Sequence, residues 1–164
     1  MIELFPARWE FDEAFAAGKP QLLWTRTISD LETPVSAMLK LGAESPGAFL
    51  LESVEGGAWL GRYSVLGLKP DLVWRVKDGQ PQLSRGRFDD LSFKPVKCGA
   101  IEALRKVIAD SALDIPPALP PMAAGLFGYL GYDMIRQIEK LPNAPHDHLK
   151  VPEALLVRPT VVAV

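Results

Sequence analysis

The chain has 164 residues, of which 48% are hydrophobic and 23% are charged. A sequence of this length and composition can bury a hydrophobic core of its own, which excludes an intrinsically disordered protein. Its 18 basic and 20 acidic residues leave a net charge of −2, so it lacks the basic surface that nucleic-acid-binding proteins need.

The cysteine content and the apolar stretches indicate a cytoplasmic protein. Cys98 is the single cysteine of the sequence and therefore forms no internal disulfide, which fits a reducing compartment. The first residues lack the basic start and the apolar run of a secretory signal. Residues 115–132 carry no charge, but four prolines at the start of this stretch predict a loop leading into a buried strand, not a membrane span.

The amino-terminal part predicts two helices separated by a strand. Apolar residues at helical spacing predict a helix over residues 8–17, which ends at Gly18. Residues 22–28 are expected to form a strand. Thr33 and Pro34 suit the N-cap and the first turn of a second helix, which ends before Gly42.

The rest of the chain predicts mostly strands. Four segments separated by turn residues are expected to form an antiparallel meander: residues 49–54, 63–68, 72–76 and 82–93. An amphipathic helix over residues 99–112 should lie on this sheet. Three further elements are expected: a strand over 122–130, a short helix over 132–139 and a strand over 154–164. The predicted fold class is therefore α+β, with a largely antiparallel sheet and a few helices on its outer face.

The end of the chain is apolar and β-branched up to Val164. An unprotected strand without a charge or a turn after it is an open edge that favours association. We therefore expect the chain to be a fragment of a longer protein, cut inside or just after a strand, and we expect the isolated chain to self-associate.

Two neighbouring segments place polar groups in an apolar context. If residues 50–54 are extended, Glu52 and Ser53 point to opposite sides of the strand. They could grip the polar head of a small zwitterion such as an amino acid, or simply bond to the backbone and to surface partners. Arg62 follows a Gly-Gly turn and could meet Glu52 across a hairpin, as an ion pair or as the other end of an amino-acid clamp.

Two other segments are less informative about chemistry. Gly125, Gly128 and Gly131 do not form a dinucleotide fingerprint or a phosphate loop. Glycines at this spacing in a strand should allow another backbone or a large side chain to approach closely, with Asp133 capping the next helix. The His-Asp-His run at residues 146–148 could in principle bind a metal, but a solvated loop is expected because no further ligand cluster supports it.

Four motifs occur in a characteristic order along the chain. They are residues 33–36 (TPVS), 49–57 (FLLESVEGG), 61–64 (GRYS) and 128–133 (GYLGYD). Together they resemble the N-terminal region of anthranilate synthase component I. The LLES and GYxGYD pair is typical of chorismate-using synthases, and the VEGG and GRYS continuation favours the anthranilate enzyme over its aminodeoxychorismate relative.

The resemblance implies a lyase that converts chorismate and ammonia into anthranilate and pyruvate with Mg²⁺, in tryptophan biosynthesis. The ammonia would come from a glutamine amidotransferase subunit. Chorismate, the catalytic residues and Mg²⁺ would belong to a C-terminal half that residues 1–164 lack, so this single N-terminal domain is expected to be inactive alone, to hold no cofactor and to form part of a shared β-sandwich. The resemblance also implies a feedback site for L-tryptophan, with Ser53, Glu52 and Arg62 as effector-binding residues.

Two alternatives stay open at this point. The chain could be the corresponding region of aminodeoxychorismate synthase component I in folate biosynthesis, or a stand-alone amino-acid-binding module. The sequence that follows Val164 in the gene would distinguish all three.

Overall fold

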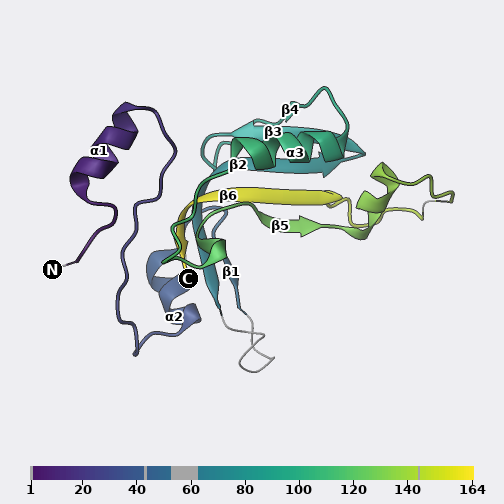
Figure 1. Ribbon diagram of the computed structural model, residues 1–164. Helices are drawn as coiled ribbons and strands as arrows, with labels where there is room; N and C mark the ends of the chain where they lie inside the picture. The colour runs from purple at the N-terminus through teal and green to yellow at the C-terminus, as the bar shows by residue number, and fades with distance from the viewer. Residues whose placement is uncertain (1, 43, 53–62, 144) are drawn as a thin grey trace.

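A central sheet dominates the structure, a computed structural model that describes residues 2–42, 44–52, 63–143 and 145–164 (Figure 1). The elements follow one another as α1 (Arg8–Ala16), α2 (Pro34–Leu41), β1 (Phe49–Leu51), β2 (Val65–Lys77), β3 (Gln80–Arg85), β4 (Lys94–Pro95), α3 (Ala100–Asp110), the 3-10 helix η1 (Pro121–Ala123), β5 (Phe127–Leu130), the 3-10 helix η2 (Tyr132–Gln137) and β6 (Ala154–Ala163).

The strands form one six-stranded antiparallel sheet around β2. Its order is β4-β3-β2-β6-β5, and β1 adds to β2 beside this path. The 13-residue β2 pairs with β1 through residues 65–67, with β3 through residues 72–77 and with β6 along most of its length. The antiparallel α+β fold predicted from the sequence is therefore confirmed.

An extra residue in β2 changes the face to which its side chains point. The register with β6 shifts between Pro70 and Leu72, so that Asp71 has no partner of its own. Because side chains alternate across a strand, one inserted residue reverses the faces of all positions that follow. Leu68 packs against Gly42 at the end of α2, whereas Leu72 lies in the core under α3.

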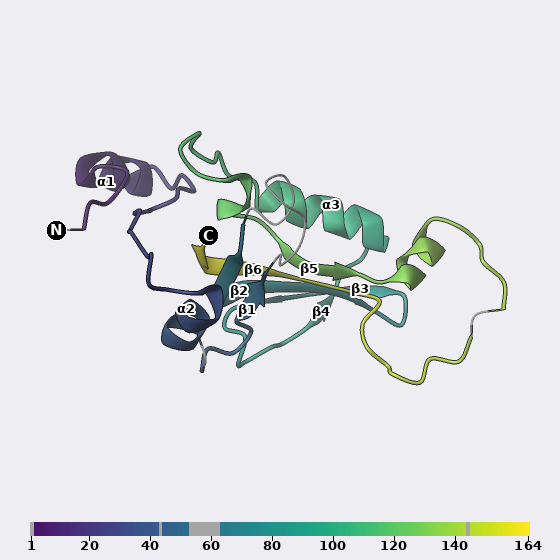
Figure 2. The same cartoon turned by 90° about the horizontal axis from the view of Figure 1, so that it is seen from below.

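Helices consequently lie on both faces of the sheet, α3 on one and α2 on the other (Figure 2). The start of α2 follows the sequence prediction, since the Ser36 N–H donates to Thr33 Oγ1 at 3.0 Å and the Thr33 N–H donates to Ser36 Oγ at 2.9 Å. Pro34 occupies the first turn. This reciprocal capping satisfies backbone donors that the first turn leaves without helical partners.

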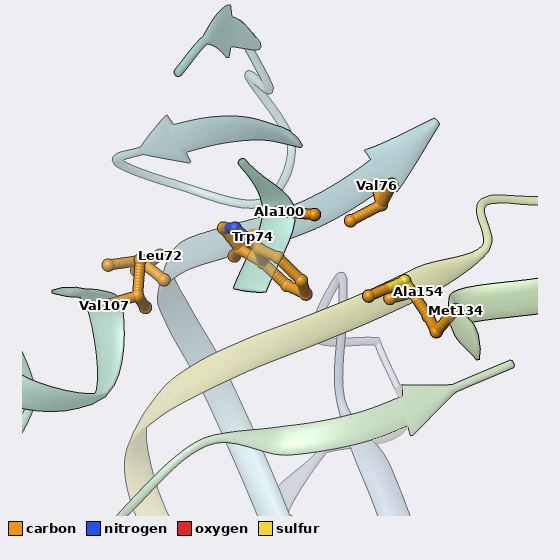
Figure 3. Packing of buried hydrophobic residues seen from close by; sticks show 7 residues of the cluster. All are labelled: Leu72, Trp74, Val76, Ala100, Val107, Met134 and Ala154. Carbon is orange, nitrogen blue, oxygen red and sulfur yellow. The ribbon is translucent and has the colours of Figure 1, made fainter. Parts of the chain in front are cut away.

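The main core lies between the sheet and α3 (Figure 3). Its buried members come from β2, α3, η2 and β6, and they are Leu72, Trp74, Val76, Ala100, Val107, Met134 and Ala154. The small residues of α3, Ala100 and Ala103, let the helix approach the sheet closely. Trp74 of β2 belongs to the same buried cluster as Ala100. The predicted amphipathic helix is confirmed.

The predicted turn at Lys69 and Pro70 is wrong. Residues 63–68 and 72–76 belong largely to one strand, β2, which passes through this point without reversing. Lys69 takes a positive φ of 50°, and Pro70 faces Pro159 of β6 at the position where the ladder is already irregular. A bulge tolerates proline because it interrupts the backbone hydrogen bonds that proline could not make.

The strand predicted over residues 22–28 is also wrong. Its single bridge joins Trp24 to Phe5 through two backbone hydrogen bonds of 2.8 Å, and the two rings stack at 4.5 Å. Ile28 is 90% exposed, so the segment has neither a second strand nor a core to stabilise it. Together with α1 this segment lies apart from the sheet (Figure 1). A hydrogen bond from Arg26 to the Ala118 carbonyl oxygen links it to the rest of the chain.

Two C-terminal predictions need correction. The apolar residues 122–130 form most of η1 and the short strand β5. Most of β5 is exposed and not buried. Among the described strands it is an edge strand that pairs with β6. The helix predicted from Tyr132 is the 3-10 helix η2, and Gly131, not Asp133, takes its N-cap position. Within the described ranges, no helix is long and apolar enough to cross a bilayer.

The close approach predicted at the glycines is confirmed for two of the three. At Gly128, whose φ is 150°, an added Cβ would collide with the Leu155 carbonyl oxygen. At Gly131 it would lie 2.8 Å from the Glu153 carbonyl oxygen, which accepts the Gly131 N–H at 2.7 Å. Gly125 has open space around it. The glycines therefore let β5 lie against β6.

The bulge in β2 is held by an ion pair. Arg158 donates from Nε and Nη2 to the two carboxylate oxygens of Asp71, each at 2.8 Å, and from Nη1 to Ser111 Oγ at 3.2 Å. These hydrogen bonds to Asp71 raise the pKa of Arg158 above its ordinary value, although burial acts in the opposite direction. A raised pKa means that folding favours the charged guanidinium of Arg158. The ion pair therefore stabilises the fold until the pH rises through that raised pKa.

Trp74 provides a test of the core. Trp74→Ala should lower the free energy of unfolding by about 3–5 kcal/mol, because it leaves a large cavity. The indole Nε1–H is buried without an acceptor among the described residues. Trp74→Phe removes that unsatisfied donor and keeps much of the volume, so the loss should stay below about 2 kcal/mol. Urea denaturation measures both values, and equal losses would contradict this description.

Asp71→Asn tests the ion pair at the bulge. It should lower the free energy of unfolding by about 1 kcal/mol, because the pair is bidentate and partly shielded. The loss should be equal at neutral and mildly alkaline pH, where Arg158 stays charged. Asp12→Asn is the matched control, since it breaks the exposed Arg8–Asp12 pair on α1 and should have almost no effect. Equal effects of the two substitutions in urea denaturation would show that the bulge does not need the pair.

Candidate functional site

The predicted binding segment lies at the end of β1, where the chain leaves the sheet. Leu51 pairs with Val65 across antiparallel strands, so the chain departs at Glu52 and returns next to its starting point. This confirms the hairpin-like arrangement expected from the sequence. Ser53 and Arg62 lie outside the described residues, so a Glu52–Arg62 pair stays a prediction.

A depression of about 370 Å³ opens at this end of the sheet. Its described lining consists of Leu50, Leu51, Glu52, Tyr63, Val65 and Met122. The lining is mainly apolar, with the carboxylate of the exposed Glu52 and the phenol of the half-buried Tyr63 as its polar groups. A volume and lining of this kind suit a small ligand with an apolar body and a cationic group, such as an aromatic amino acid.

A glycine and two aromatic rings hold β1 in place. Gly67 faces Phe49 across the strand pair, and any side chain at position 67 would collide with the Phe49 ring. The same ring lies 5.1 Å from the ring of Phe127 in β5, measured between centroids. Because the ring covers a glycine, it can lie across β2 and link β1 to β5. This contact positions the neighbouring pocket residues.

Met122 is a lining residue that the sequence motifs do not indicate. It belongs to η1, where Pro121 occupies the first turn and the Pro120 carbonyl oxygen accepts the Ala123 N–H at 3.0 Å. No pairing pattern in the sequence relates this turn to β1. Tyr63 was also missed as a lining residue, although its place in the GRYS motif was an available signal.

The His-Asp-His run lies in an exposed loop, as predicted. The rings of His146 and His148 are 4.5 Å apart, and Asp147 accepts the backbone N–H groups of Leu149 and Lys150 at 3.0 Å. The carboxylate therefore closes the local turn. Across the part of the chain that the structure describes, no group of three or more His, Cys, Asp or Glu residues could hold a metal ion.

A second groove of about 650 Å³ lies between the segment that follows α1 and the loop that follows α3. It is lined mainly by prolines and other apolar residues, with Trp24 on one side, and its charged members are Lys19 and Asp114. Both charged side chains belong to exposed residues. No described residue of the motifs singled out in the sequence lines this groove.

Comparisons with known proteins identify relatives along nearly the whole chain. No family model matches it. The anthranilate synthase component 1 of Cereibacter sphaeroides is 50% identical over 94% of this chain. The proteins of the same name from Thermus thermophilus and Pseudomonas aeruginosa are 39% and 38% identical over 84% and 96% of it. The chain spans only about a third of these relatives, 31%, 28% and 32% of their lengths.

A solved structure agrees with the sequence relatives. The crystal structure of anthranilate synthase component I from Streptococcus pneumoniae superimposes with a TM-score of 0.51 over 84% of this chain and 28% of its own length. At 22% identity this likeness shows the fold. The sequence identities and the common fold together show that the chain belongs to the anthranilate synthase component 1 family and matches its N-terminal region.

Proposed function

We propose that this chain is the N-terminal part of an anthranilate synthase component I, which converts chorismate and ammonia into anthranilate and pyruvate in tryptophan biosynthesis. The observation that carries the proposal is the 50% identity over 94% of the chain to a relative of that name. The names of the relatives also favour the anthranilate enzyme over the aminodeoxychorismate enzyme and over a stand-alone module.

The chemistry itself is assigned to other parts of the full-length enzyme. Chorismate and Mg²⁺ would bind in the region that the relatives have beyond this match, and a glutamine amidotransferase subunit would supply the ammonia. The described residues contain no cluster of metal-ligating side chains, so this part of the chain does not fit a Mg²⁺ site. For this part of the chain we propose a structural and regulatory role.

The regulatory role rests on the depression at the end of β1. We infer that it accepts L-tryptophan as a feedback effector. The apolar lining suits an indole, and the carboxylate of Glu52 suits the effector's ammonium group. Ser53 and Arg62 are proposed as further effector-binding residues on the resemblance alone. The depression borders β1 and β2, so a bound effector would act directly on the central strand of the sheet.

The isolated chain should form no anthranilate from chorismate, Mg²⁺ and ammonium. Catalysis requires its acid, base and metal ligands to be positioned together, and the described residues hold no cluster of metal ligands. Anthranilate fluorescence measures product formation, with a full-length anthranilate synthase as the positive control. A rate comparable with that enzyme would refute the assignment of catalysis to the missing region.

Glu52→Gln should weaken feedback inhibition in the full-length enzyme that carries this sequence. Loss of a charge-assisted hydrogen bond costs about 1.5–3 kcal/mol, which raises the tryptophan concentration for half inhibition roughly 10- to 150-fold. Ser53→Phe, which should fill the pocket, is expected to raise it at least about tenfold. Each variant is compared with its own uninhibited rate.

Glu44→Gln is the matched control for this experiment. Glu44 is exposed in the turn between α2 and β1 and does not line the depression. It should leave inhibition by tryptophan unchanged. Normal inhibition of both the Glu52 and the Ser53 variants would show that the effector binds elsewhere.

A further inference from the structure

Met122 lines the depression from a different part of the chain than the other described lining residues. Of the described lining residues, the others come from β1, from β2 and from the residues next to them, whereas Met122 comes from η1. On the strand side, the pairing of Leu51 with Val65 fixes the direction of both side chains. Among the described residues, β1, the start of β2 and their neighbours therefore form most of the lining, and Met122 is the contribution of η1.

The backbone that carries Met122 is held at both ends. Before it, Pro120 and Pro121 restrict the backbone, with a φ of −67° at Pro120. After it, Phe127 enters the sheet opposite Val157, and its ring packs at a tilt against the ring of Phe49 in β1. The turn therefore keeps its place relative to β1, while the unbranched thioether side chain can adjust.

We propose that Met122 determines which aromatic side chain the effector pocket accepts. This inference rests on the proposed feedback function, which it deepens by naming the residue that selects the effector. The side chain of Met122 contacts the ring of the bound amino acid from η1, because sulfur and aromatic rings pack favourably. Its length sets the width available to the ring.

The test compares two effectors in the full-length enzyme that carries this sequence. The concentrations of L-tryptophan and of 5-methyltryptophan that give half inhibition are measured for the parent and for Met122→Ala, each relative to its own uninhibited rate. The shorter side chain should raise the value for tryptophan about 5- to 10-fold, because apolar contact is lost. The value for 5-methyltryptophan should rise much less, so that the ratio between the two effectors falls about fivefold.

Two further variants separate selection from general damage. Met122→Leu keeps a similar volume and should leave the ratio within about twofold of the parent. Met38→Ala truncates another half-buried methionine, which packs beside Gly42 on α2, and should not change the ratio. If Met122→Ala does not fold, Met122→Val makes a smaller truncation and should shift the ratio in the same direction.

The possible failures are distinguishable. A parent enzyme that tryptophan does not inhibit would refute the proposed feedback function, and the inference with it. A parent that is inhibited, with an unchanged effector ratio in the truncated Met122 variants, would refute the role of Met122 alone. A ratio that shifts equally in Met38→Ala would show a general structural effect and would also overturn the inference.

Discussion

The packing of this fold depends on one extra residue in the middle of its central strand. Without the insertion at Asp71, Leu68, Leu72 and Trp74 would all lie on the same face of the sheet, because side chains alternate along a strand. With it, the first half of the strand buries Leu68 against α2 and the second half buries Leu72 and Trp74 under α3. Asp71, at the irregular position, has no paired residue in β6. Its carboxylate accepts two hydrogen bonds from Arg158. One strand therefore packs against a helix on each face of the same sheet.

The candidate site uses the same division of β2. Its first half carries β1 and the depression, and its second half forms the stable core with α3. A ligand that binds beside β1 would thus contact an element continuous with the core of the domain. Met122 of η1 also lines the site, and β5, which follows η1, enters the sheet at Phe127. Three separate parts of the chain, β1, the start of β2 and η1, therefore have to be assembled before the depression exists.

Local signals were enough to predict much of this structure. The Thr33 cap, the apolar face of residues 99–112 and the apolar run at the end of the chain correspond to α2, α3 and β6. Part of the candidate site was also predictable, since the carboxylate of Glu52 is conspicuous in an apolar segment of the sequence. Met122 did not stand out, because a methionine in a proline-rich turn has many ordinary explanations. Met122 lines the depression because distant segments pair as strands. No local pattern in the sequence predicts that pairing.

The sequence by itself determined the antiparallel α+β class, the Thr33 cap of α2 and, through its motif order, the family to which the chain belongs. These properties follow from neighbouring residues, whose backbone preferences and apolar spacing act over a few positions. Tertiary structure alone decided that Lys69 and Pro70 belong to an irregular strand and not to a turn, that residues 22–28 remain outside the sheet, and that Met122 lines the same depression as β1. In each case the outcome depended on whether a partner strand or a core surface lay within reach. That depends on the assembled sheet, because an extended segment gains stability only from the strands and side chains that cover it.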